Sequence, residues 1–128
     1  AGTPYLFSST SPHTVVLVLE KNKADINFLK TLISDFHSKS IGNEMFEISA
    51  LLMGVEKHLI MIKSFESASE TMLYCQLFKE DKKLNQAIDY SETQIMSIST
   101  ENFKEFYKNK DLEGYYAFFL KKYNKLEY

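Results

Sequence analysis

Apolar residues recur along the chain with the periods of strands and helices, and the pattern begins near residue 14. Residues 15–19 read Val-Val-Leu-Val-Leu, a β-branched-rich apolar run short enough to predict a buried strand. Asp25 then precedes apolar positions at helical spacing as far as Phe36. Because aspartate is a good helix N-cap, we expect a helix that starts after Asp25 and ends near Ser38.

The middle of the chain predicts a hairpin followed by a second helix. Residues 46–53 and 58–62 flank the turn sequence Gly-Val-Glu-Lys, which is typical of a β-hairpin. Ser67-Ala68-Ser69-Glu70 matches a capping box, so a helix should start there and run to about Lys79. The side chains expected on its inward face are Ala68, Met72, Cys75 and Phe78.

The last third predicts a short strand and two aromatic helices. Residues 80–85 are polar and are expected to form a loop or a frayed turn, whereas Ile95-Met96-Ser97-Ile98 predicts a fourth, shorter strand. Ser99-Thr100 is expected to cap a helix over residues 101–108, and Asp111 a second one that reaches Tyr123.

This order of elements predicts the fold class and the domain organisation. The order β-α-β-β-α-β is that of an α+β, ferredoxin-like plait, here with two additional short C-terminal helices. Residues 1–13 hold two prolines and a serine-rich cluster, which indicates a leader or linker. Residues 14–128 are expected to form a single α+β domain that includes the C-terminal aromatic helices, residues 101–123.

Strand alternation predicts an apolar patch on the sheet face opposite the two plait helices. If Phe46, Ile48, Ala50 and Leu52 point toward those helices, then Leu51 and Met53 point away from them. In the next strand, Leu59 and Met61 can join Leu51 and Met53, which leaves Ile60 and Ile62 on the inward face. Such a patch is larger than a monomer usually exposes, so either the aromatic C-terminal helices or a second molecule should cover it. The candidate contact face comprises Leu51, Met53, Leu59, Met61, Lys63, Tyr115, Tyr116 and Phe119.

Composition and charge disfavour some partners. The net charge is -2, and all 15 basic residues are lysine. The chain therefore has no guanidinium group, which binds a guanine edge or two phosphate oxygens through a pair of hydrogen bonds. This argues against nucleic-acid binding. No apolar run approaches the roughly 18 residues of a membrane span, and the first 12 residues lack the pattern of a signal peptide.

The reactive residue types form no recognisable site. His13, His37 and His58 have no metal-ligand spacing, and Cys75 lies on a presumed core stripe. The closest carboxylate groups, Glu44 with Glu47 and Glu101 with Glu105, adjoin lysines and suit solvated surfaces. Phosphate-binding loops, nucleophile elbows and zinc-protease motifs are missing from the sequence, so we predict no catalytic, cofactor-binding or metal residue and no cofactor.

Several segments resemble a known family. The strings Ile-Ser-Thr-Glu-Asn-Phe at 98–103, Phe-Tyr-Lys-Asn-Lys-Asp at 106–111 and Gly-Tyr at 114–115 are similar to the C-terminal domain of SprE/PorW-type tetratricopeptide-repeat proteins of gliding motility and type IX secretion. Residues 29–36 and 62–65 also resemble it. The resemblance implies a non-enzymatic protein-interaction or assembly module on the periplasmic side of the bacterial cell envelope.

Two other classes of function stay open. Residues 59–78 resemble the sporulation-related repeat, which implies a peptidoglycan- or glycan-binding module that uses its sheet face. A regulatory plait that binds a small ligand between subunits is a third class, and a homodimer is compatible with each of these. A protein partner in the envelope is the first expectation.

Overall fold

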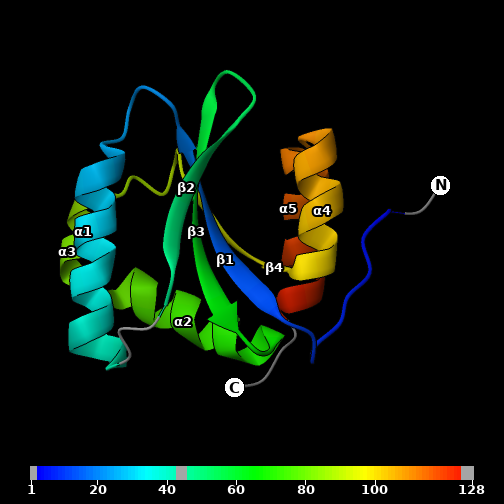
Figure 1. Cartoon of the computed structure of the whole chain (residues 1–128), viewed down its shortest axis with the longest axis horizontal. Helices are drawn as coiled ribbons and strands as arrows, with labels where there is room; N and C mark the ends of the chain where they lie inside the picture. The colour runs from blue at the N-terminus through cyan, green and yellow to red at the C-terminus, as the bar shows by residue number, and fades with distance from the viewer. Residues whose placement is uncertain (1–2, 43–45, 125–128) are drawn as a thin grey trace.

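Four strands form one antiparallel sheet with helices on both sides (Figure 1). The structure is a computed structural model and describes residues 3–42 and 46–124. In chain order, the elements are β1 (His13–Glu20), α1 (Ile26–Phe36), the π-helix η1 (His37–Ile41), β2 (Ile48–Met53), β3 (Lys57–Phe65), α2 (Ala68–Glu80), α3 (Lys82–Ala87), β4 (Gln94–Ser99), α4 (Thr100–Asn109) and α5 (Leu112–Tyr123). The protein is therefore α+β, as predicted.

The sheet has the strand order β2-β3-β1-β4, which puts β1 and β3 at the centre. Every neighbouring pair is antiparallel, with Val18 opposite Leu59 in β3 and Val16 opposite Met96 in β4. The predicted fourth strand is confirmed, since residues 94–99 pair with β1.

Two hydrophobic clusters lie on the two faces of the sheet, and β1 contributes to both. Val15 and Leu17 pack in a cluster with α1, α2 and α3, whereas Val16 and Val18 pack in a second cluster with α4 and α5. A central strand covered on both faces has no solvent-facing positions, which explains the unbroken apolar run at 15–19. Figure 1 shows α1 and α3 on one side of the sheet and α4 and α5 on the other.

The predicted helix starts are confirmed by their caps. The side chains of Asp25, Ser99 and Asp111 each accept a hydrogen bond from the amide three residues later, at 3.0, 3.1 and 3.1 Å. Ser67 caps α2 through the amide of Glu70 at 3.3 Å. The Glu70 carboxylate, however, accepts from the amide of Glu66 at 2.7 Å, one residue earlier than a capping box predicts.

Three local predictions differ from the structure. Residues 82–87 form α3 instead of a loop, because Asp81 caps the turn through the amide of Leu84 at 3.0 Å and Leu84 is fully buried. The first helix continues as the π-turn η1 and ends at Gly42, whose φ of 71° suits glycine. On α2, Tyr74 is buried, while Met72, expected inside, is half-buried.

The segment expected as a leader contributes to the core. Tyr5 is only 2% exposed and belongs to the cluster with α4 and α5. Its hydroxyl donates to Asp111 Oδ2 at 2.8 Å, and the carbonyls of Ser9 and Pro12 accept from the amides of Ala68 and Thr100. A single aromatic residue in a proline- and serine-rich stretch belongs to no apolar repeat, so the sequence pattern did not indicate that Tyr5 is buried.

Across residues 3–42 and 46–124, no helix has both the length and the apolar character to cross a bilayer.

Candidate functional site

The two outer strands of the sheet differ in how their free edges are covered. On β4, Ser97 is fully buried, and its carbonyl accepts a hydrogen bond from the hydroxyl of Tyr115 at 2.6 Å. The hydroxyls of Ser97 and Thr71 are also hydrogen-bonded to each other. The edge of β4 is thus closed by α2 and α5, and β2 is the other outer strand of the sheet.

The register of β2 determines which of its backbone groups face away from the sheet. The amide of Lys63 donates to the carbonyl of Glu47 at 3.0 Å, so residues 47 and 63 form a hydrogen-bonded pair. In an antiparallel ladder such pairs alternate with pairs whose backbone groups point outward. The amides and carbonyls of Ile48, Ala50 and Leu52 therefore point away from β3, and we call these three residues the β2 edge.

The β2 edge is largely open. The Leu52 carbonyl accepts a hydrogen bond from the Tyr107 hydroxyl of α4 at 2.7 Å. Among the residues that the structure describes, none bonds to the outward amide or carbonyl of Ile48 or Ala50. Ala50 is exposed, and the side chain of Leu52 is 44% exposed. Figure 1 shows β2 in front of β3 and β1, with no helix across it.

The β2 edge also lacks the features that usually protect an edge strand. Natural proteins block such strands with lysines, prolines, bulges or a covering element. The strand Ile-Ser-Ala-Leu-Leu-Met contains no charge and no proline, and its pairing with β3 runs without a register shift. Unpaired amides and carbonyls on an unprotected strand can take up another strand by main-chain hydrogen bonds.

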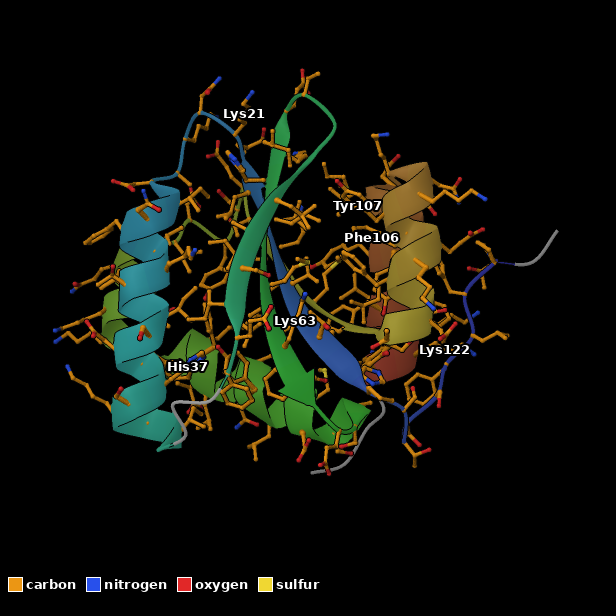
Figure 2. The ribbon with its side chains drawn as sticks, in the orientation of Figure 1. Lys21, His37, Lys63, Phe106, Tyr107 and Lys122 are labelled. Atoms are coloured by element: carbon orange, nitrogen blue, oxygen red, sulfur yellow. The ribbon has the colours of Figure 1, made fainter. Side chains whose placement is uncertain are left out.

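A groove of about 360 Å³ lies beside β2 on the side of α4. Leu51, Met61, Lys63 and Phe103 line it, together with the start of β1. The Lys63 ammonium lies 3.6 Å from the Glu47 carboxylate, and the Glu47 side chain is the more exposed of the two. Figure 2 shows Phe106 and Tyr107 between the sheet and α4, and Lys63 at the sheet.

Most of the predicted contact face lies inside the molecule. Met53, Leu59, Met61, Tyr115 and Phe119 are buried in one cluster, because α4 and α5 fold over the sheet. The C-terminal helices α4 and α5 therefore cover the apolar patch that strand alternation predicted. Leu51, Lys63 and Tyr116 are half-buried, and of these Leu51 and Lys63 line the groove beside β2.

The three histidines are dispersed, and His13 and His37 are buried in the core. His13 Nε2 is hydrogen-bonded to the hydroxyl of Tyr123 at 2.7 Å, and His37 Nε2 to that of Tyr74 at 2.6 Å. Burial lowers the pKa of His13, and it lowers that of His37 from 6.5 to about 4. Both imidazoles are therefore neutral near pH 7. His58 lies apart from them, in β3.

The lone cysteine is a core residue, as predicted. Cys75 is buried in the cluster with α1 and α2, and burial raises the pKa of its thiol to about 12. A thiol in this state is protonated and inert near neutral pH. The predicted carboxylate pair Glu101 and Glu105 is on α4, where Glu101 is exposed and Glu105 half-buried, whereas Glu44 lies outside the described residues.

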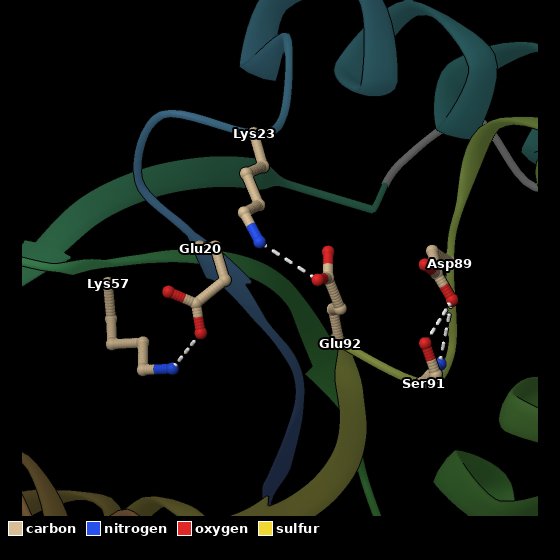
Figure 3. Close-up of polar contacts among 6 residues, drawn as sticks. All are labelled: Glu20, Lys23, Lys57, Asp89, Ser91 and Glu92. Atoms are coloured by element: carbon tan, nitrogen blue, oxygen red, sulfur yellow. Dashed lines mark hydrogen bonds and ion pairs between the residues drawn. The ribbon is translucent and has the colours of Figure 1, made fainter.

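One polar cluster lies at the Glu20 end of β1, whereas His13 begins that strand. Figure 3 shows the contacts within this cluster. Lys23 pairs with Glu92 at 2.9 Å, and Lys57 pairs with Glu20, which lowers the pKa of the Glu20 carboxyl. A cavity of about 170 Å³ adjoins Glu20, Lys23 and Glu92. Glu20 and Glu92 each pair with a lysine, and Asp89 accepts a hydrogen bond from the Ser91 hydroxyl at 2.6 Å. In the described part of the chain, no three His, Cys, Asp or Glu residues are placed to hold a metal. We assign it a role in joining the loops.

Comparisons with known proteins give no family assignment: no protein-family model, no curated protein and no solved structure matches the chain. The class of site therefore rests on geometry, and that class is an open edge strand beside a shallow groove. Strand alternation predicted which face each side chain of β2 points to. The uncharged run from Ile48 to Val55 gave no sign that β2 lies at the border of the sheet, since edge strands usually carry charges.

Proposed function

We propose that the protein is a non-enzymatic protein-interaction or assembly module that binds by adding a partner strand to the β2 edge. The observation that carries this proposal is the outward, unpaired backbone of Ile48 and Ala50 on an uncharged strand. Main-chain hydrogen bonds supply the affinity in such complexes, and side-chain contacts supply the specificity. We further propose that the groove at Leu51 and Lys63 receives a side chain of the added strand.

We also infer that the fold is a ferredoxin-like plait with additions. The order β1-α1-β2-β3-α2-β4 and the sheet order β2-β3-β1-β4 support it. Helices α4 and α5 are the additional elements, and α3 is a short insertion before β4.

The periplasmic side of the bacterial cell envelope is proposed as the location, with a link to gliding motility or type IX secretion. It rests on the resemblance of residues 98–103 and 106–111 to SprE/PorW-type proteins. Helical repeats with a period of about 34 residues, encoded upstream of this sequence, would support the link. A coding region without such repeats would contradict it.

A glycan-binding role on the sheet face has less support. The sporulation-related repeat binds glycan strands on that face, but here α4 and α5 pack over it and bury Leu59 and Met61. A small ligand between subunits has two open hollows near β2, the groove and one of about 500 Å³ lined by Phe46, Phe65 and Tyr74, but it would leave the outward backbone groups of Ile48 and Ala50 unpaired. A protein strand fits the available surface better than either.

Capture from bacterial envelope extract tests the proposal. The Ala50 amide points outward, so Ala50→Pro removes a donor without breaking the ladder to β3, and an edge strand tolerates proline there. Ala50→Val keeps the amide and is the matched control. We expect wild type and Ala50→Val to retain the same protein, and Ala50→Pro to lose at least tenfold of it.

Two results would contradict the proposal. One is equal retention of that protein by Ala50→Pro, provided that circular dichroism shows the variant folded. The other is retention by purified cell-wall sacculi alone, with nothing captured from the extract, since this outcome indicates a glycan ligand.

A further inference from the structure

We propose that the strand added to the β2 edge belongs to a second copy of this chain, antiparallel to the first and with Ala50 opposite Ala50. The proposal rests on the β2 edge being the interaction surface, and it names the partner. A two-fold axis through Ala50 would join two four-stranded sheets into one continuous sheet.

The outward backbone groups are symmetric about Ala50. Ile48 and Leu52 are each two residues from it, so an antiparallel copy centred at Ala50 sets Ile48 opposite Leu52 and Leu52 opposite Ile48. Each facing pair exchanges an amide and a carbonyl, as in a regular ladder. The Leu52 carbonyl already accepts from Tyr107, but a carbonyl oxygen has two lone pairs and can accept a second donor.

The side chains match in the same register. Ile48, Ala50 and Leu52 lie on one face of the strand, and the copy continues them into a single apolar row. Leu52 is 44% exposed in the isolated chain, and pairing gives it Ile48 as a neighbour. The small Ala50 side chain lets the two strands meet at the axis without a clash.

The absence of charge near Ala50 is informative because of the symmetry. At a two-fold axis a residue meets its own copy, so any charge there would repel itself. A strand that binds a different protein has no such restriction at its midpoint. β2 carries no charged residue from Ile48 to Met53.

The ends of β2 are complementary in charge. Glu47 precedes the strand and is well exposed, with Lys63 at 3.6 Å on the same chain. At the other end, Lys110 Cδ would lie 3.7 Å from a Cβ on Gly54. Because the proposed register sets residue 47 opposite residue 53, the Lys110 ammonium of the second copy would approach Glu47 from its other side.

Sedimentation of charge variants tests both the partner and the register. Ala50→Lys and Ala50→Glu each place like charges at the axis, and Ala117→Lys is the matched control because Ala117 is exposed on α5, away from β2. We expect wild type and Ala117→Lys to dimerise reversibly, and each Ala50 variant to dissociate about 100-fold more readily. An equimolar mixture of Ala50→Lys and Ala50→Glu should dimerise again, since lysine then faces glutamate.

Amide exchange on the wild-type protein gives a second readout that needs no variant. In concentrated samples the amides of Ile48, Ala50 and Leu52 should exchange more slowly than in dilute ones, while the other amides keep their rates. This measurement decides the matter if an Ala50 variant does not fold.

Three results would overturn the second copy as partner: a wild-type monomer up to about 1 mM, a dimer that is indifferent to charge at Ala50, or a mixture of variants that stays monomeric. If any of these occurs while Ala50→Pro still loses its envelope protein, the β2 edge binds a different chain and only the dimer fails. Loss of both effects removes the β2 edge as a surface altogether.

Discussion

His37 is buried at the start of the π-turn, and its imidazole loses proton affinity there because the charged form cannot be solvated. Burial lowers the pKa of His37 to about 4 in the folded protein, against 6.5 for an exposed histidine. Between these values the unfolded chain binds more protons than the folded one. The free energy of unfolding should therefore fall as the pH falls from about 6.5 to about 4, by roughly 2–3 kcal/mol from this residue.

Urea denaturation of wild type and His37→Gln at pH 7.5 and pH 4.5 measures this effect. Glutamine keeps a hydrogen bond within reach of the Tyr74 hydroxyl but takes up no proton, so His37→Gln should lose less stability on acidification. His13 is also buried with a lowered pKa, and it leaves a residual slope in both proteins. An NMR titration in which the His37 ring protonates near pH 6.5 would contradict the assignment.

Tyr115 closes the edge of β4 through one hydroxyl group. Tyr115→Phe removes the 2.6 Å bond to the Ser97 carbonyl and leaves that carbonyl buried without its donor. We expect a loss of about 1–2 kcal/mol in the free energy of unfolding. Tyr116→Phe is the control, because Tyr116 is half-buried and its hydroxyl has no partner among the described residues, so its loss should stay below about 0.5 kcal/mol. Equal losses in the two variants would show that the bond to Ser97 adds no stability.

At the scale of elements, helix caps of the same residue type differ in the number of hydrogen bonds that their side chains accept. Asp25 caps α1 at the surface, through the Phe28 amide alone. Asp111 caps α5 through the Gly114 amide and also accepts from the Tyr5 hydroxyl. We expect Asp25→Ala to cost about 1 kcal/mol and Asp111→Ala about 2 kcal/mol in chemical denaturation.

A double-mutant cycle separates the two functions of Asp111. Tyr5→Phe removes the hydroxyl and keeps the ring, so Asp111→Ala in that background should cost no more than Asp25→Ala does. A cost that stays near 2 kcal/mol in the Tyr5→Phe background would mean that the cap alone accounts for the difference.

Elements with a clear period could be predicted from the sequence, and elements without one could not. Strand alternation assigned Ile60 and Leu59 to opposite faces, and the structure places them in the two separate clusters. Helix α3 was missed because it is a short polar turn held by Leu84, and its signal was the spacing of Asp81, Leu84 and Ile88. The π-turn at His37–Ile41 left no mark in the apolar pattern.

The candidate site was harder to predict than the fold for a physical reason. The spacing of apolar side chains indicates which face of a strand is buried. Whether the backbone of Ile48 and Ala50 is unpaired depends instead on the position of β2 at the border of the sheet. The predicted contact face named apolar side chains that the chain's own helices then covered. The lining residues Leu51 and Lys63 belong to both the prediction and the groove, because they lie where α4 leaves the sheet uncovered.

At the scale of the whole molecule, the first residues of the chain hold the last helix in place. The Tyr5 ring meets Tyr115 edge-on at 4.9 Å and lies 5.6 Å from Phe118, so a segment without regular structure fills the space beside α5. Aromatic pairs of this geometry stabilise a core beyond the area they bury. The neighbouring Leu6 side chain, in contrast, is 79% exposed.

Alanine substitutions at these two adjacent positions test whether residues 3–12 belong to the folded unit. Tyr5→Ala removes a buried ring and its bond to Asp111, and we expect a loss of about 3 kcal/mol in urea denaturation. Leu6→Ala should change stability by less than about 0.5 kcal/mol, since its side chain is already in water. If Tyr5→Ala were as stable as Leu6→Ala, the segment would be a leader that rests on the domain without supporting it, and the sheet and α4 would hold α5 in position.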